Sequence, residues 1–106
     1  MPGPAEMESA LRALYCGNAV VAVITFKVDT KEADRIANEI AKFGAIEDVF
    51  FVTGDTDIVA KARFRNYKEL KEFVVRSLGT IAGIKGTKTL MVVTAYKEGG
   101  ARRETT

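Results

Sequence analysis

Histidine and tryptophan are absent from this sequence of 106 residues, which contains one cysteine and two prolines. Because histidine is the commonest general base and metal ligand, its absence argues against acid–base and metal-dependent catalysis. The single cysteine, Cys16, excludes a disulfide bond within the chain and has no activating neighbour in the sequence. We therefore expect no enzyme activity, no metal and no cofactor, and we expect Cys16 to be buried or incidental.

Strong charge and long apolar runs are also missing. The 16 basic and 14 acidic residues leave a net charge of +2, too even a balance to predict a nucleic-acid surface. No apolar stretch is long enough to span a membrane, and the N-terminus lacks the basic-then-apolar pattern of a secretory signal. We therefore predict a cytoplasmic protein of one small domain that does not contact membranes.

The pattern of apolar residues predicts the element order β-α-β-β-α-β, preceded by a short helix within residues 5–15. Right-handed βαβ crossovers and a central hairpin favour a ferredoxin-like α+β fold, with a four-stranded antiparallel sheet and two helices on one face. Asn66 begins a capping-box pattern with Glu69. The predicted segments are an N-terminal segment at 1–18, a domain at 19–96 and a flexible tail at 97–106.

One face of the predicted sheet is left uncovered by the helices. The side chains that strand alternation places under the helices are Val20, Ile24, Phe26, Ile58 and Ala62. The residues expected on the opposite face are Val21, Val23, Val49, Phe51 and Val59. An exposed apolar patch of this kind usually marks an interface, so we predict a dimer in which two sheets pack face to face. The alternative is a smaller patch that the N-terminal helix or the tail covers.

The sequence between the second and third strands, from Gly54 to Asp57, predicts a hairpin turn. Glycine accepts positive φ, and aspartate bonds nearby backbone amides. Asp55 and Asp57, together with free amides at a strand end, could hold the amino and carboxylate groups of a small zwitterion. The simpler interpretation is that both aspartates serve only the turn, and for Asp55 we favour it.

Two motifs in this element order resemble the effector-binding domain, called the RAM domain, of the Lrp/AsnC feast/famine regulators. They are Thr53-Gly54-Asp55-Thr56-Asp57 and Gly83-Ile84-Lys85-Gly86-Thr87-Lys88-Thr89, and the resemblance covers residues 19–96. It implies dimers that form through sheet faces, rings of dimers that are commonly octamers, and amino-acid effectors bound between dimers. The ligand-binding residues that the resemblance implies are Gly54, Asp55, Thr56, Asp57, Thr87 and Thr89.

The sequence also departs from this family's pattern. Only 18 residues precede the first strand, too few for a helix-turn-helix with its supporting helix. The chain thus resembles a stand-alone RAM protein, from which we expect no direct DNA binding and, as a partner, a full-length Lrp/AsnC homologue. Thr56 stands where many relatives carry an aromatic or other larger residue, and Ala82 where a proline is usual, so the effector is not identified.

The remaining charged residues fit structural roles. Lys61, Arg63 and Arg65 form a basic stripe on the third strand. We expect this stripe to face solvent or to pair with a neighbouring dimer rather than to bind phosphates. Glu47 and Asp48 are adjacent in a strand, so they should point to opposite faces and serve no common site.

Two other function classes share the predicted fold. A small ferredoxin-like isomerase or monooxygenase is disfavoured by the lack of histidine. An RNA-binding domain needs exposed aromatic residues on the central strands, and the third strand offers the basic stripe instead. We therefore expect a module that senses a small molecule, an amino acid first of all, and that oligomerises in the service of transcription regulation.

Overall fold

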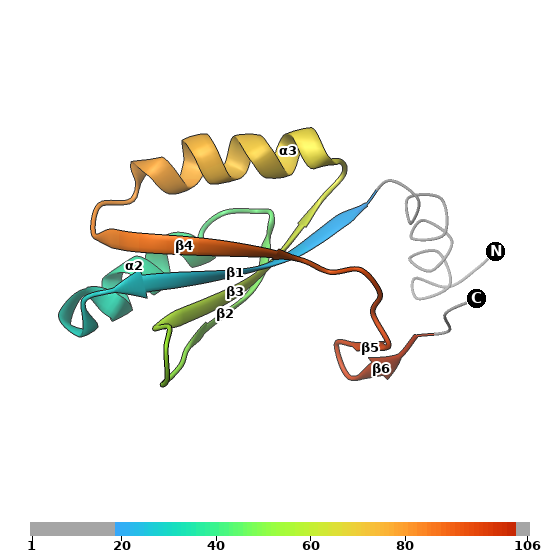
Figure 1. The fold of residues 1–106 in the computed structure, drawn as a ribbon, viewed down its shortest axis with the longest axis horizontal. Helices are drawn as coiled ribbons and strands as arrows, with labels where there is room; N and C mark the ends of the chain where they lie inside the picture. The colour runs from blue at the N-terminus through green and yellow to red at the C-terminus, as the bar shows by residue number, and fades with distance from the viewer. Residues whose placement is uncertain (1–18, 104–106) are drawn as a thin grey trace.

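The computed structural model describes residues 19–103 of the chain (Figure 1). The predicted N-terminal helix and Cys16, like residues 104–106, lie outside the described residues. The main elements are β1 (Val20–Val28), α2 (Ala33–Ala41), β2 (Ile46–Phe51), β3 (Ile58–Phe64), α3 (Tyr67–Glu72) and β4 (Ile84–Met91). A short 3-10 turn, η1 (Thr30–Glu32), leads into α2. Helix α3 continues through a π turn, η2 (Phe73–Ser77), and a 3-10 turn, η3 (Leu78–Thr80).

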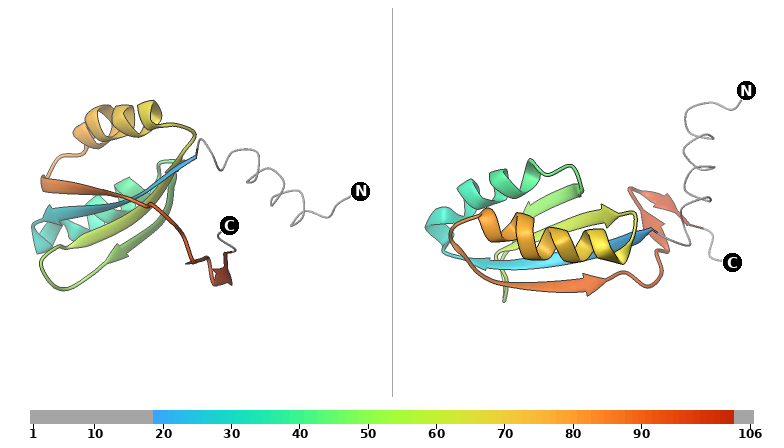
Figure 2. Two further views of the ribbon diagram at one scale, coloured as in Figure 1. Left: turned by 45° about the vertical axis from the view of Figure 1, so that its right-hand side comes forward. Right: turned by 90° about the horizontal axis from the view of Figure 1, so that it is seen from above.

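The four main strands form one antiparallel sheet in the order β2-β3-β1-β4. Strands β3 and β1 lie at the centre of this sheet, and β2 and β4 form its edges. Both helices cover the same face, and the other face is left open (Figure 2). The predicted ferredoxin-like arrangement of one antiparallel sheet and two helices is therefore confirmed.

The core lies between the helices and alternate residues of the two central strands. These strand residues have no exposed surface and include Ala22, Ile24, Phe26, Ile58, Ala60 and Ala62. Helix α2 covers them with Ile36 and Ile40, which are four residues apart and therefore lie on one side of the helix. Full burial of each large apolar side chain stabilises the fold by about 1.5–3 kcal/mol.

Asn66 begins the second helix, as its sequence pattern predicted. The Asn66 side-chain oxygen accepts a hydrogen bond from the Glu69 amide at an N···O distance of 2.9 Å. The Glu69 carboxylate in turn accepts from the Arg65 amide (3.2 Å) and pairs with the Arg65 guanidinium (2.8 Å). Arg65 therefore has its partner within its own chain, at the junction of β3 and α3.

Strand β2 contains a β-bulge near its start. Ile46 is paired with Ala62, and Asp48 is paired with Lys61, the preceding residue of β3. Glu47 is therefore one residue extra in β2. An extra residue of this kind shifts the alternation of every residue that follows it in the strand.

The bulge changes the face on which two of the residues predicted for the open face lie. Val49 is opposite the buried Ala60 and packs against the core, and Phe51 is opposite the buried Ile58. Directly paired residues share a face of the sheet, so Val49 and Phe51 lie on the helix side and their predicted placement is wrong. Phe50, which is 57% exposed, takes their place on the open face.

Residues 97–103, which belong to the segment expected to be a flexible tail, form a β-hairpin. Strands β5 (Lys97–Glu98) and β6 (Ala101–Arg102) are joined by two glycines with positive φ, Gly99 and Gly100. The hairpin lies at the end of the molecule where β1 begins and β4 ends (Figure 1).

No helix among residues 19–103 is both long and apolar enough to cross a membrane. The same residues contain no group of three or more histidine, cysteine or acidic side chains placed to hold a metal ion.

Gly83, in the link that leads into β4, combines positive φ with close packing, so we predict that Gly83→Ala destabilises the fold. Its φ is 100°, and an added Cβ would lie 3.0 Å from both Arg35 Nη2 and Ile36 Cδ1. Chemical denaturation should show a loss of about 1–3 kcal/mol in the free energy of unfolding, the usual cost of a strained backbone position. Gly86→Ala is the matched control, because an added Cβ there meets nothing within 4 Å and φ is not positive. Equal losses in the two variants would contradict this account.

Candidate functional site

The turn between β2 and β3 is tied to the end of β1 by its own side chains. Gly54 has a φ of 130°, which only glycine adopts without strain. Thr56 Oγ1 donates a hydrogen bond to the Phe26 carbonyl oxygen (2.9 Å), and the Asp57 amide donates to the same oxygen (3.0 Å). One Asp57 carboxylate oxygen accepts from the Val28 amide (2.9 Å). These bonds give the turn a defined position against β1.

The same contacts separate the roles of the two aspartates. The Asp57 carboxylate is engaged with the backbone of β1, as the simpler interpretation of the turn held. Asp55 is exposed, and its carboxylate forms no hydrogen bond or ion pair with any other residue of the range 19–103. The Asp55 carboxylate is thus without a partner among these residues, whereas one oxygen of the Asp57 carboxylate is engaged.

An open cleft of about 410 Å³, which we call the turn cleft, lies beside this turn on the open face of the sheet. The Lys27 ammonium donates a hydrogen bond to the Asp55 carbonyl oxygen (3.2 Å). A basic side chain therefore lies next to the residue whose carboxylate is available. The residues that line the cleft come from β1, the turn and β4: Thr25, Lys27, Asp55, Thr56, Gly86, Thr87, Lys88 and Leu90.

The pairing of β1 with β4 places the two predicted threonines on the helix side of the sheet. Thr87 is opposite Phe26, and Thr89 is opposite Ile24, and both partners are buried. Thr87 still borders the turn cleft at the sheet edge, whereas the structure does not bring Thr89 to it. Successive strand residues point to opposite faces, so Lys88, which lies between the two threonines, points to the open face and lines the cleft.

Of the six predicted ligand residues, three line the turn cleft: Asp55, Thr56 and Thr87. Gly54 and Asp57 shape the turn without lining the cleft. Sequence reasoning missed Lys27 and Lys88. Lys88 lies inside the second motif. The residue of β1 that lies opposite it, and so its neighbours in the cleft, depend on the β1–β4 register, which no local pattern indicates.

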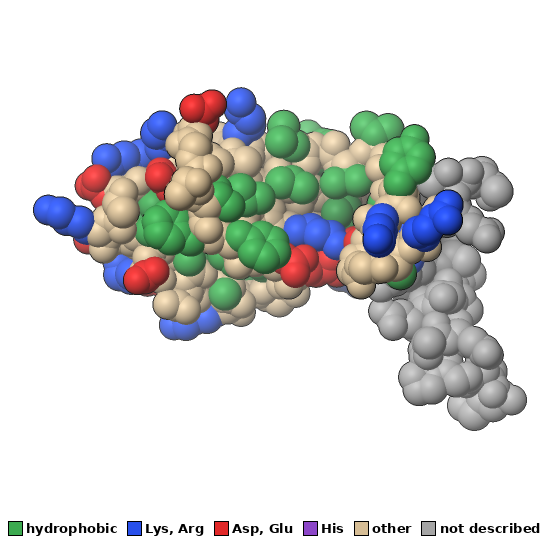
Figure 3. Space-filling model, turned by 90° about the horizontal axis from the view of Figure 1, so that it is seen from below, with side chains coloured by type: hydrophobic (Ala, Val, Ile, Leu, Met, Phe, Trp, Pro, Cys, Tyr) green, Lys and Arg blue, Asp and Glu red, His purple; other side chains and the backbone are tan. Residues whose placement is uncertain are grey.

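The open face carries an apolar patch, which we call the open-face patch: Val21, Val23, Phe50, Val59 and Leu90. Val23 is opposite Leu90 in β4, and Val59 is opposite Phe50 in β2. Val21, Val23 and Val59 therefore lie where they were predicted. Phe50 and Leu90 are 57% and 49% exposed. Seen from this side, apolar side chains extend over much of the face, interrupted by basic and acidic groups (Figure 3).

The hairpin is connected to the open face through a group of charged side chains, which we call the hairpin ion cluster. Glu98 of β5 pairs with Lys61 and Arg63 of β3, and with Arg103 Nη2 at 2.9 Å. Glu47, the extra residue of the bulge, pairs with Lys61 at 3.2 Å and with Arg63 at 2.9 Å. The basic stripe on β3 thus has acidic partners within the chain.

The bulge also brings the adjacent acids Glu47 and Asp48 to one face. Both line the same hollow beside Lys61 and Arg63, so the expectation that they point to opposite faces is wrong. The physical reason is that strict alternation applies only to a regular strand. Because Glu47 is engaged with two basic side chains, the pair has the features of an ion cluster and not of a catalytic acid pair.

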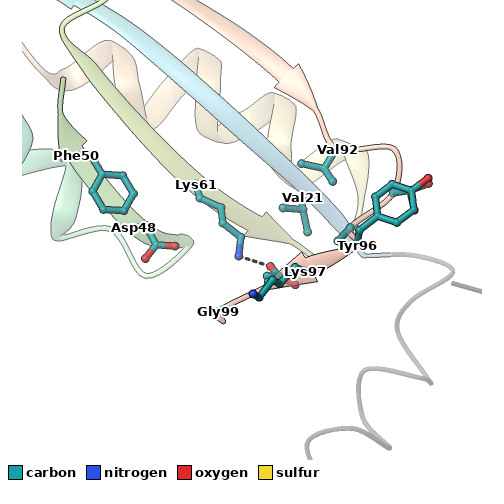
Figure 4. Close-up of a pocket in the computed structure, with 11 residues that line it drawn as sticks. Val21, Asp48, Phe50, Lys61, Val92, Tyr96, Lys97 and Gly99 are labelled. Atoms are coloured by element: carbon teal, nitrogen blue, oxygen red, sulfur yellow. Dashed lines mark ion pairs between the residues drawn. The ribbon is translucent and has the colours of Figure 1, made fainter. Parts of the chain in front are cut away.

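A hollow of about 540 Å³ lies between the hairpin and the sheet (Figure 4). Val21, Phe50 and Val92 line it from the sheet side, and Tyr96 lines it from the connection to β5. Lys61 extends across this space toward the hairpin and its partner Glu98 (Figure 4). Ion pairs therefore join the hairpin to the sheet across this hollow.

The hairpin ion cluster lowers the pKa of both of its glutamates below the ordinary value of 4.5. Burial acts to raise the pKa of Glu98, but the hydrogen bond from Lys61 and the charges of Arg63, Lys61 and Arg103 outweigh it. Burial likewise acts to raise the pKa of Glu47, and the hydrogen bonds from Arg63 and Lys61 outweigh it. Both carboxylates therefore favour the charged form in the folded chain.

The model of the Lrp/AsnC ligand binding domain matches residues 21–102. This range contains the sheet except for the first residue of β1, both helices, the turn cleft and most of the hairpin. The chain belongs to the Lrp/AsnC family. The resemblance found in the two motifs is thereby confirmed, and the matched range extends past residue 96 into the hairpin.

A curated relative of this Lrp/AsnC chain is the HTH-type transcriptional regulator FL11 of Pyrococcus horikoshii. It is 37% identical over 82 residues, which are 77% of this chain and 54% of the relative. FL11 of Pyrococcus furiosus is 35% identical over the same shares of the two chains. The chain spans about half the length of these curated relatives, and the relatives are named as regulators of transcription.

Solved structures share the Lrp/AsnC fold. A transcriptional regulator of Neisseria meningitidis, solved as a complex with L-Met, has a TM-score of 0.71 at 20% identity, covering 97% of this chain and 62% of that one. At this identity the likeness concerns the fold alone. A protein from Thermus thermophilus has a TM-score of 0.68 at 25% identity, and the match covers 74% of this chain and 99% of that one.

For this Lrp/AsnC domain we predict that stability falls in acid, and that Glu98→Gln weakens this dependence. Both glutamates of the hairpin ion cluster have lowered pKa values in the folded state. Their contribution is therefore present above about pH 4.5, the ordinary value, and is lost as the pH falls through the lower folded values.

Glu98→Gln should reduce the free energy of unfolding at neutral pH by roughly 1.5–3 kcal/mol, the range for hydrogen bonds to charged groups. Its stability should then decrease less steeply than that of the parent chain below about pH 4.5. Urea denaturation across this pH range measures both effects. Glu72→Gln is the control, because Glu72 forms no ion pair within residues 19–103. Identical pH profiles for the parent and Glu98→Gln would rule out this role of Glu98.

Proposed function

We propose that this chain is a sensing and assembly module of transcription regulation, which binds a free amino acid in the turn cleft and associates through its open face. The observation that carries the proposal is that a basic and an acidic side chain border one end of the cleft without an ion pair between them. There the Lys27 ammonium lies beside the Asp55 backbone, and the Asp55 carboxylate is available to a ligand.

These two side chains complement the two α-groups that every free amino acid carries. The Asp55 carboxylate accepts hydrogen bonds from the ligand's ammonium, and the Lys27 ammonium donates to the ligand's carboxylate. Charge-assisted hydrogen bonds of this kind are shorter and stronger than neutral ones. The Thr56 hydroxyl is already engaged with Phe26, so its role is to hold the turn, and Thr87 borders the ligand from β4.

The known relatives support both halves of this proposal. The Neisseria meningitidis regulator of the same fold was solved with L-Met, which supports an amino acid as the ligand class. FL11 is named a transcriptional regulator, which supports regulation as the outcome of sensing.

The position of the turn cleft supports a link between ligand binding and assembly. Leu90 belongs both to the cleft and to the open-face patch. A second copy that covers the patch by sheet-to-sheet packing would therefore form an outer wall near the cleft. By linkage, a ligand that binds the dimer more tightly than the monomer also shifts the monomer–dimer equilibrium toward the dimer. We further propose that such dimers associate into rings and mix with full-length homologues, which share the same domain.

The two alternative functions gain no support from the geometry. Base stacking in an RNA-binding domain of this fold requires aromatic side chains on the open face of the central strands. None of the residues on the open face of β1 and β3 is aromatic: Val21, Val23, Thr25, Lys27, Val59, Lys61 and Arg63. The adjacent acids Glu47 and Asp48 give no support for an enzyme, because Glu47 is engaged in the hairpin ion cluster.

Amino-acid binding predicts a ligand-dependent rise in melting temperature. At about 100 times its dissociation constant, a ligand that binds only the folded state adds roughly 2.7 kcal/mol of stability. A thermal-shift screen of the twenty amino acids should therefore find one or a few that stabilise the chain. Asp55→Asn should abolish this shift and leave the unliganded melting temperature nearly unchanged. A screen in which no amino acid stabilises the parent chain would remove the main support for sensing.

Asp57→Ala is the comparison for that experiment. Because alanine has no oxygen to accept the hydrogen bond from the Val28 amide, this substitution should lower the melting temperature of the unliganded chain. Substitution of the two aspartates should therefore have different effects: loss of the ligand-induced rise in melting temperature at Asp55, and a lower melting temperature of the unliganded chain at Asp57.

Association through the open face predicts different effects for two adjacent phenylalanines. Phe50 and Phe51 are exposed to a similar extent, 57% and 55%, but lie on opposite sides of the sheet. Phe50→Lys places a charge in the open-face patch and should yield a monomer, because burial of a charge in an interface without a partner is strongly unfavourable. Phe51→Lys should leave the oligomer intact. Light scattering at matched concentrations measures both, and an oligomer that survives Phe50→Lys but not Phe51→Lys would place the interface on the helix side.

A further inference from the structure

We propose that the turn cleft selects an amino acid whose side chain carries a second acid group, such as glutamate or aspartate. This inference rests on the proposed function, since it assumes that the cleft is the amino-acid site. It goes further because it names the class of amino acid and the residue, Lys88, that distinguishes this class from the others.

The charges that line the turn cleft do not balance. Two lysines, Lys27 and Lys88, face one aspartate, Asp55, and the other lining residues are uncharged. A neutral zwitterion satisfies one lysine and the aspartate and leaves the second lysine without a counterion. A ligand with two carboxylates and one ammonium matches all three charges. Because charges near a protein surface interact more strongly than in bulk water, this match favours the acidic ligand.

The strand register gives the two lysines separate positions in the cleft. Lys27 is opposite Gly86 in β4, and Lys88 is opposite Thr25 in β1. The two lysines are thus diagonal neighbours on one face of the sheet, whose backbone positions are about 7–8 Å apart. Lys27 lies at the turn end, beside Asp55, where the α-groups are held. Lys88 lies farther along the cleft, where the ligand's side chain extends.

Lys88 is also available to a ligand in a way that the neighbouring lysine of β4 is not. Lys85 forms an ion pair with Asp29 at 3.3 Å. Lys88 forms no ion pair or hydrogen bond with any residue in the range 19–103. Its counterion is therefore not supplied by the part of the chain that the structure describes, although its side chain lines a cleft.

Gly86 leaves the floor of the cleft open between the two lysines. It lies directly opposite Lys27, and an added Cβ would meet nothing within 4 Å. The space above Gly86 is therefore not needed by the fold. A ligand that extends from Lys27 toward Lys88 passes over this position, with Leu90 bordering it as an apolar wall.

The experiment compares glutamate with glutamine and aspartate with asparagine by isothermal titration calorimetry on the full chain. The members of each pair have nearly the same shape, so a difference in affinity reports the second carboxylate. We expect each acidic ligand to bind at least about tenfold more tightly than its amide, a factor that corresponds to 1.4 kcal/mol. Added salt should reduce this preference, because the cleft is open to solvent.

Lys88→Gln should remove most of the preference for glutamate over glutamine while glutamine binding changes little. Lys68→Gln is the matched control, because it removes the same charge from an exposed position on α3 that does not line the cleft. Gly86→Ala should weaken binding of both ligands without loss of stability, since the added methyl group occupies only cleft space.

The possible results separate this inference from the proposed function. A preference for the acidic ligands that Lys88→Gln removes and Lys68→Gln keeps would support the inference. Amino acids that bind the cleft with no preference for an acidic side chain would overturn it and leave the proposed function standing. A preference that Lys88→Gln does not change would overturn the role of Lys88. If no amino acid binds at all, both the inference and the proposed function fail.

Discussion

Strand β1 is hydrogen-bonded on both sides, to β3 and to β4, so its register decides which side chains of the whole sheet share a face. Alternate residues of β1 are buried under the helices, and the others form the open face. The turn cleft at one end of β1, with Lys27, and the open-face patch at its middle, with Val23, both follow from this pairing. A slip of one residue would exchange the buried and the open sets, so the same hydrogen bonds specify the core and the candidate site.

Short polar side chains of the turn beside the cleft differ in whether they bond the backbone of β1. Thr56 and Asp57 satisfy backbone groups of β1, because half-buried backbone amides and carbonyls need hydrogen-bond partners. Their engagement holds the turn in place, while the Asp55 carboxylate has no partner among residues 19–103. A motif with two acids therefore does not reveal which acid serves the turn, since the answer depends on which one faces an unsatisfied backbone group.

Ion pairs connect the hairpin to the sheet, whereas apolar side chains pack the core. The β-bulge turns Glu47 toward Lys61 and Arg63, and Glu98 completes the cluster from β5. A hollow lies between the hairpin and the sheet, and these ion pairs connect the two across it. An attachment of this kind responds to acid and to salt, which the apolar core does not.

The sequence alone determined the element order, the ferredoxin-like fold, the Asn66 cap and the membership of the Lrp/AsnC family, because these depend on local patterns: alternation, helical spacing, turn residues and two short motifs. Only the tertiary structure decided which residues meet. The bulge moved Phe51 to the helix side and Phe50 to the open face, and the β1–β4 register brought Lys88, not Thr89, to the turn cleft. The physical reason is that pairing between strands far apart in the chain is set by the packing of the whole sheet, and a single extra residue reverses every side chain beyond it.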